Sequence, residues 1–180
     1  MSIIQTIPTI SEALLQASAV YTQYCHSIPD HLFFGQPEGK WSPAQQTKHL
    51  ITSTNMARLA FTLPGFMVRM IGGKPNRPSR SYDELVKRYH DKLVGGGQAS
   101  GRYIPKPIPA STGREKWLRQ YETSMIKIAG TIGKIKQEER LDQYLAPHPL
   151  LGKITLRELT FFTIYHSHHH LDSIRKMTGS

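Results

Sequence analysis

Four of the nine histidines lie within five positions near the end of the chain, in the stretch TIYHSHHHLDSI of residues 163–174. On an α-helix, His170 lies one turn after His166 and about 40° around the axis, so both side chains share a face. His169 lies near that face at the i+3 offset, whereas His168 points about 200° away from His166. The spacing therefore places at least two of these histidines on one face of a helix.

This face should be the one that packs into the protein core. Leu159 and Phe162 precede His166 on the same apolar stripe, and Ile174 follows it closely. Buried imidazoles need partners for both ring nitrogens, and two neutral rings one turn apart can share a divalent metal ion. Core histidines that only form hydrogen bonds remain the alternative, and the His-x-x-x-His spacing alone does not decide between the two.

A metal held by three protein ligands would need a histidine from a second helix, and His49 is the obvious candidate. It lies seven residues after Ser42, a good N-cap that is followed by Pro43 and completed by Gln45 as a capping box. Seven residues are close to two full turns. Three histidines would leave coordination positions open for water or substrate, as in catalytic rather than structural sites.

Apolar periodicity and helix start signals predict an all-α protein, a four-helix bundle. The expected helices span residues 11–27, 42–63, 112–136 and 155–177. Capping boxes are expected at Ser42–Gln45, Thr112–Glu115 and Thr155–Glu158. No segment shows the alternation of a β-strand.

The second and third helices are joined by a long irregular connection, residues 64–111, with a shorter helix at 82–93. A connection of this length in a compact domain is usually functional or mobile. We expect residues 72–111, with a Gly-Gly-Gly run and a Pro-x-Pro-x-Pro pattern, to be the most mobile part and to lie over the mouth of the site.

Length and composition are those of an ordinary globular protein, with 180 residues, 38% hydrophobic, and we expect one domain over residues 1–180. The single cysteine, Cys25, excludes an internal disulfide, and no signal peptide or membrane span is recognisable, so we expect a cytoplasmic protein. The net charge is +10, and residues 69–140 carry 16 Lys/Arg against 7 Asp/Glu. These charges are dispersed, which favours a solvated surface over a nucleic-acid interface.

Two stretches resemble the signature regions of the DinB/YfiT-like metalloenzymes: KWSPAQQTKHL at 40–50 and HPLLGKITLRELTFFTIYHSHHHLDSI at 148–174. The resemblance implies a four-helix bundle with a central metal held by His49, His166 and His170, and it makes His169 a neighbour rather than a ligand. Some members of the family are S-transferases or isomerases that use low-molecular-weight thiols such as bacillithiol or mycothiol. Members often form dimers, so a homodimer is expected here as well.

The leading hypothesis is a metal-dependent enzyme, a transferase or hydrolase that acts on a small electrophilic molecule. Imidazole ligands favour Zn²⁺ or Ni²⁺, and a low-molecular-weight thiol is a candidate second cofactor. Gln45, Gln46 and Ser53 flank His49 and are candidates for supporting hydrogen bonds, and His148 could lie at the pocket mouth. A metal-stabilised interaction protein without turnover is the first alternative. Nucleic-acid binding through the basic middle region ranks last, and no general acid or base is identifiable.

Overall fold

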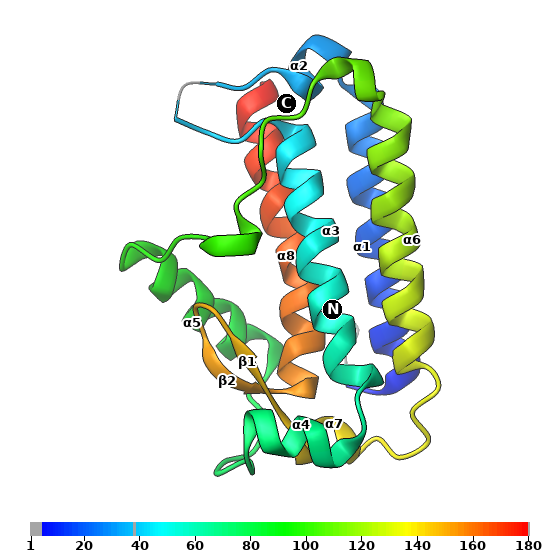
Figure 1. Ribbon diagram of the computed structural model, residues 1–180, viewed down its shortest axis with the longest axis vertical. Coiled ribbons are helices and arrows are strands. Elements are labelled where there is room, and N and C mark those ends of the chain that lie inside the picture. The colour runs from blue at the N-terminus through cyan, green and yellow to red at the C-terminus, as the bar shows by residue number, and fades with distance from the viewer. Residues whose placement is uncertain (1–4, 38, 180) are drawn as a thin grey trace.

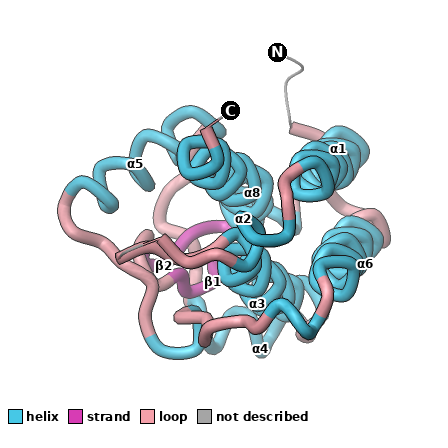
Figure 2. Tube along the Cα trace, turned by 90° about the horizontal axis from the view of Figure 1, so that it is seen from above, coloured by secondary structure: helices cyan, strands magenta, loops and turns pink. Residues whose placement is uncertain are grey.

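The computed structural model describes residues 5–37 and 39–179, and its core is a bundle of four long helices (Figure 1). They are α1 (Ile7–Ser27), α3 (Pro43–Thr62), α6 (Arg114–Ile132) and α8 (Leu156–Thr178). Seen from above, each helix has two neighbours, in the order α1, α6, α3, α8 and back to α1 (Figure 2). The prediction of an all-α bundle is confirmed, and α3 and α8, which carry the histidines of interest, lie side by side.

The long connection has a topological cause. Helices α3 and α6 run in the same direction, whereas α1 and α8 run in the opposite one (Figure 1). Parallel neighbours cannot be joined by a tight turn, so residues 63–113 must bring the chain back along the length of the bundle. This return path includes α4 (Gly65–Gly72), α5 (Tyr82–Val94) and the short 3₁₀ helices Gly101–Tyr103 and Ala110–Thr112. Helix α5 confirms the predicted short helix at 82–93, and it packs against α8.

A buried carboxylate fixes the return path to the start of α8. Glu158 is fully buried and accepts two hydrogen bonds from the Arg77 guanidinium, with N–O distances of 2.6 and 2.9 Å. It also accepts the backbone N–H of Arg80 at 2.7 Å. A bidentate, charge-assisted pair of this kind is geometrically specific, so it holds the entry to α5 in place beside α8.

Three predicted details of the helices differ from the structure. Helix α1 begins at Ile7 rather than at 11, because Thr6 and Thr9 form a capping box that was not predicted. The predicted capping box at Thr112 and Glu115 is wrong. Gly113 is the N-cap of α6, and the Thr112 hydroxyl instead accepts a hydrogen bond from the Trp117 indole N–H at 2.8 Å. Helix α6 also ends at Ile132 instead of 136, where the backbone turns at Gly133.

A two-stranded hairpin precedes α8 and corrects the expectation that the chain forms no strands. Strand β1 (Leu145–His148) pairs antiparallel with β2 (Gly152–Thr155). The strands have four residues each, too few for a recognisable alternation, and Pro147 and Pro149 argue against a strand in the sequence. Pro147 is tolerated because the ladder has only two strands and therefore only edges, and Pro149 lies in the turn that follows β1. Two further short helices, α2 (Asp30–Phe34) and α7 (Arg140–Gln143), cover the ends of the bundle (Figure 1).

Candidate metal centre

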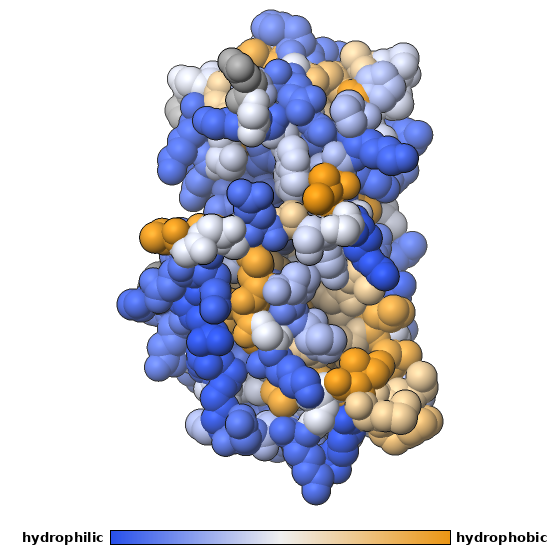
Figure 3. Space-filling model, turned by 60° about the vertical axis from the view of Figure 1, so that its left-hand side comes forward, coloured by the Kyte–Doolittle hydropathy of each residue, from blue (hydrophilic) through white to orange (hydrophobic). Residues whose placement is uncertain are grey.

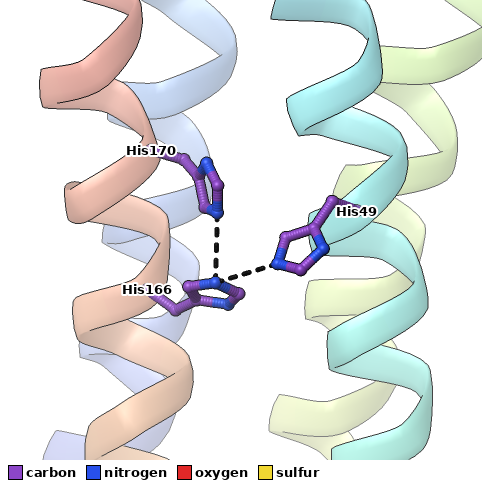
Figure 4. Close-up of side chains that lie close together, drawn as sticks. All are labelled: His49, His166 and His170. Carbon is purple, nitrogen blue, oxygen red and sulfur yellow. Dashed lines mark hydrogen bonds between the residues drawn. The ribbon is translucent and has the colours of Figure 1, made fainter. Parts of the chain in front are cut away.

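Helices α3 and α8 bring His49, His166 and His170 together in the interior of the bundle (Figure 4). All three side chains are buried. The Nε2 atom of His166 lies 3.1 Å from Nε2 of His49 and 3.1 Å from Nε2 of His170. The same three residues were selected from the sequence, and the structure places their Nε2 atoms around one point.

Hydrogen bonds on the far side of two rings orient these Nε2 atoms. Nδ1 of His49 lies 2.7 Å from the carbonyl oxygen of Tyr103. Nδ1 of His170 lies 2.8 Å from the amide oxygen of Gln46, whose amide nitrogen donates to the carbonyl of Trp41. Because a carbonyl oxygen can only accept, Nδ1 carries the hydrogen in both rings. Both Nε2 atoms therefore present lone pairs to the centre of the cluster.

This arrangement leaves the three nitrogens without enough hydrogens to satisfy one another. Nε2 of His166 can donate a single hydrogen, to either His49 or His170 but not to both. At least one of the two short N–N contacts then has no hydrogen bond, and a buried lone pair is left without a donor, which is unfavourable. A cation at the centre would accept all three lone pairs at once, so the donor set fits a metal ion.

The distances suit such an ion. With metal–nitrogen bonds of about 2.1 Å, neighbouring ligand nitrogens are about 3.4 Å apart in a tetrahedral site and about 3.0 Å apart in an octahedral one. The observed separations of 3.1 Å lie between these two values. Three ligands on one side of the ion would leave the remaining positions free for other molecules.

Burial keeps the three imidazoles neutral, which is the state that binds metal. Desolvation lowers the pKa of His166 and of His170 well below the ordinary histidine value, and the neighbouring histidines lower both further. Desolvation also lowers the pKa of His49, against an opposing effect of the Tyr103 carbonyl. The cluster therefore resists protonation and remains a set of lone-pair donors to lower pH than isolated histidines would.

The other histidines of the sequence lie apart from this cluster. His168 is half-buried and is not one of the three histidines whose Nε2 atoms meet. His169 is also outside the group, although its ring centroid lies 5.2 Å from that of His170. His148 packs against Phe162 with ring centroids 4.2 Å apart, and burial lowers its pKa to about 4. His26, His31 and His90 are exposed.

Of the predicted supporting residues, Gln46 touches the cluster directly, whereas Gln45 caps α3 and bonds to the carbonyl of Pro105. Ser53 lines the adjacent cavity. Tyr103 and Trp41, which act through their main-chain carbonyls, were not among the predicted residues. A main-chain carbonyl is present at every residue, so no residue type at these positions could have indicated the role.

A cavity of about 760 Å³ opens beside the three histidines. Its walls come from α3 and α8, from the β1–β2 turn, and from the return path at Tyr89, Leu93 and Gly97–Ala99. Residues of the segment 72–111 and His148 thus line the cavity, whereas their place at its mouth stays a prediction. The mobility of the segment stays a prediction.

The fold and the site together define a helical-bundle protein with a buried three-histidine centre that faces a large cavity. The sequence profile of the DinB superfamily matches residues 13–174, and the chain belongs to this family. A comparison with curated proteins gave no match to this chain. In the described part of the chain, none of the helices combines the length and the apolarity that crossing a membrane requires.

Proposed function

We propose that this protein is a metal-dependent enzyme in which Nε2 of His49, His166 and His170 binds one divalent transition metal ion, Zn²⁺ or Ni²⁺. The observation that carries the proposal is the convergence of three buried Nε2 atoms, two of them held as lone-pair donors by Tyr103 and Gln46. Neutral imidazoles suit Zn²⁺ and Ni²⁺ better than Mg²⁺ or Ca²⁺.

Turnover, rather than a purely structural metal, is supported by the space around the cluster. His49, His166 and His170 all line the cavity, so a molecule in it has access to the centre. A structural site would be closed by a fourth protein ligand. Among the residues that the structure describes, the group of possible ligands consists of His49, His166 and His170. The combination favours an enzyme over the alternative of a metal-stabilised interaction protein.

The reaction we propose is a transfer or hydrolysis at an electrophilic small molecule. When bound, the ion supplies Lewis acidity that lowers the pKa of a thiol or water at an open position. The protein's own contribution is orientation and exclusion of water. Gln46 and the Tyr103 carbonyl hold the imidazole rings, and Phe162 stacks on His166 with ring centroids 4.7 Å apart. A low-molecular-weight thiol is the nucleophile that we propose to test first.

The test is the metal content of protein purified without a histidine tag, measured by elemental analysis on single alanine variants. We expect about one equivalent in the wild type and severe loss in His49→Ala, His166→Ala and His170→Ala, because two imidazoles form a weak site. His168→Ala is the matched control from the same helix and should keep its metal. His169→Ala should also retain it, although this residue lies next to a proposed ligand.

Two results would contradict the assignment. Full metal retention in His49→Ala would show that the site does not bridge the two helices. Loss confined to His168→Ala would show that another face of α8 binds the metal. If the metal is bound as expected, activity is measured in metal-loaded protein with a thiol and a simple electrophile. Consumption of the free thiol by the wild type, and not by His49→Ala, would support the transferase.

A further inference from the structure

The cavity beside the three histidines changes character along its length. On the side of Trp41, its lining includes polar groups from Lys40, Gln46 and Ser173. On the opposite side, towards α4, the lining becomes apolar. It consists there of side chains such as Leu59, Ala60, Leu63, Val68, Ile71 and Leu145. The histidines lie between the two parts, so the cavity has a polar end, a reactive centre and an apolar end.

The apolar part is elongated. Along α3 and its C-cap, the lining continues from His49 to Leu63, which corresponds to roughly 20 Å at the rise of an α-helix. An extended apolar chain of about this length would lie along it.

The apolar lining continues onto the surface at the same end of the molecule. Phe66 and Met70 of α4 are 73% and 75% exposed, and Ile71, which lines the cavity, is 51% exposed. Figure 3 shows hydrophobic side chains gathered on this face towards its lower end, the end at which Figure 1 places α4. Contiguous exposed apolar side chains often mark a binding surface, and this group borders the cavity.

The charge of the cavity lining, like the polar groups named above, lies on the Trp41 side. Among the described residues, Lys40 is the only lysine or arginine in the lining, and no aspartate or glutamate occurs there. Imidazole ligands carry no negative charge, so the three histidines would not compensate the charge of a divalent ion. An anionic group on the ligand would therefore be attracted to the centre and to the Lys40 side of the cavity.

We propose that the substrate is an anionic amphiphile with an extended apolar chain. Its charged, reactive end lies at the three histidines, and its chain extends along α3 towards Leu63 and α4. The position of the head group rests on the proposed metal function, whereas the position of the chain rests on the cavity alone. Each additional methylene buried along the apolar wall should strengthen binding until the chain reaches α4.

The test is a series of saturated carboxylates, from butanoate through hexanoate, octanoate and decanoate to dodecanoate, titrated into metal-loaded and metal-stripped protein by calorimetry. We expect the affinity to rise by up to about fourfold per methylene, the factor that corresponds to 0.8 kcal/mol per buried CH₂. Dodecyltrimethylammonium, which has the same chain but a cationic head, should bind the metal-loaded protein at least about tenfold more weakly than dodecanoate.

A substitution inside the apolar part tests whether the chain binds in this cavity or elsewhere on the apolar surface. Ala60→Trp places a large ring in the channel, about 16 Å along α3 from His49. It should reduce dodecanoate binding at least about tenfold while leaving butanoate binding and the metal content unchanged. The matched control is Ala19→Trp, at an exposed position of α1 that is not part of the lining. Circular dichroism and thermal melting of both variants establish that they are folded.

Each outcome decides one part of the proposal. Affinities that do not depend on chain length, or an Ala60→Trp variant that binds dodecanoate as the wild type does, would overturn the chain position. Equal binding of the cationic and anionic amphiphiles would overturn the anionic head group. Chain-length dependence in protein that never takes up metal would support the cavity assignment and overturn the metal function, so the two failures are distinguishable.

Discussion

At the scale of single residues, Gln46 has the most specific role around the histidine cluster. Its amide oxygen accepts from Nδ1 of His170, and its amide nitrogen donates to the Trp41 carbonyl, so the amide has one favourable orientation. A hydrogen bond to the far nitrogen of a ligand histidine fixes the ring and raises its basicity. The residue therefore supports the proposed centre without touching the ion.

We expect Gln46→Leu to weaken metal binding by about 10- to 100-fold, because His170 loses the acceptor that sets its tautomer. Gln46→Glu keeps an acceptor in the same place and should bind metal at least as well as the wild type. Ser53→Ala, which removes a hydroxyl from the cavity wall, is the control and should leave the affinity unchanged. Competition with a chromophoric chelator measures all three, and wild-type affinity in Gln46→Leu would contradict the role.

The residues that would bind the metal were predictable from the sequence, whereas the residues that orient them were only partly so. His166 and His170 follow from the helical repeat, and the Ser42 cap fixes the phase of the helix that carries His49. The partner of His49 is the Tyr103 carbonyl, which arrives from the irregular connection. Its position depends on how that connection folds back, which local patterns do not encode.

At the scale of elements, the contact between α4 and the hairpin depends on a glycine. A Cβ added to Gly72 would lie 1.8 Å from the carbonyl oxygen of Leu145, a backbone atom that cannot move aside easily. This close approach lets α4 pack on β1 and form the apolar end of the cavity. A side chain at this position must therefore separate the two elements.

We expect Gly72→Ala to lower the free energy of unfolding by 1–3 kcal/mol, the typical cost of overpacking. Gly130→Ala is the matched control, because Gly130 also lies in a helix but a Cβ there meets nothing within 4 Å. That variant should be more stable than the wild type by about 0.5–1 kcal/mol, since alanine favours the helix. Urea unfolding of both variants gives the comparison, and a neutral Gly72→Ala would contradict the packing argument.

The cap of α5 controls how firmly the wall of the cavity is held. The Ser81 hydroxyl accepts the backbone N–H of Glu84, and the Glu84 carboxylate accepts the backbone N–H of Ser81 in return. Ser81→Ala should remove about 1 kcal/mol from the start of this helix. Hydrogen exchange of α5 should then accelerate about fivefold, with α8 unchanged, whereas Ser81→Asp should keep the cap. Equal acceleration in both helices would mean that α5 does not open separately.

Helices that begin with a capping box were predictable from the sequence, whereas the cap of α6 and the hairpin, which depend on contacts elsewhere, were not. The boxes at Ser42 and Thr155 gave the starts of α3 and α8, because a cap is formed within a few residues of sequence. Thr112 is of a residue type that often caps helices. Its hydroxyl instead accepts a hydrogen bond from the Trp117 indole, and the capping pattern in the sequence does not indicate this partner. The hairpin at Leu145–Thr155 packs through β1 against α4, an element that is distant from it in sequence.

At the scale of the whole molecule, part of the positive charge serves the fold. Arg77 and Arg80 pair with the buried Glu158, and Arg114 pairs with Asp30 at 2.6 Å while donating to main-chain carbonyls at the end of α1. These side chains belong to the basic region that suggested nucleic-acid binding. Their internal pairing supports the reading of that region as an ordinary surface with structural ion pairs.

The buried histidines make the stability of the metal-free protein depend on pH. Burial lowers the pKa values of His49, His166 and His170, and lowers that of His148 to about 4. Below the ordinary value of about 6.5, the unfolded chain therefore binds protons that the folded protein does not. Because the unfolded state holds more protons in that range, the free energy of unfolding must fall as the pH falls.

We expect the metal-free protein to lose stability between pH 6.5 and pH 4, with a limiting slope of about 1.4 kcal/mol per pH unit for each proton that the unfolded state binds in excess. His49→Gln removes one such group, so its slope should be smaller by up to this amount. Metal-loaded protein should be more stable near neutral pH and should lose that advantage in acid, as protons compete for the ligands. Urea unfolding at a series of pH values measures the slopes. A metal-free stability that stays constant down to pH 4 would show that the cluster takes up its protons in the folded state, and that burial does not keep these imidazoles neutral.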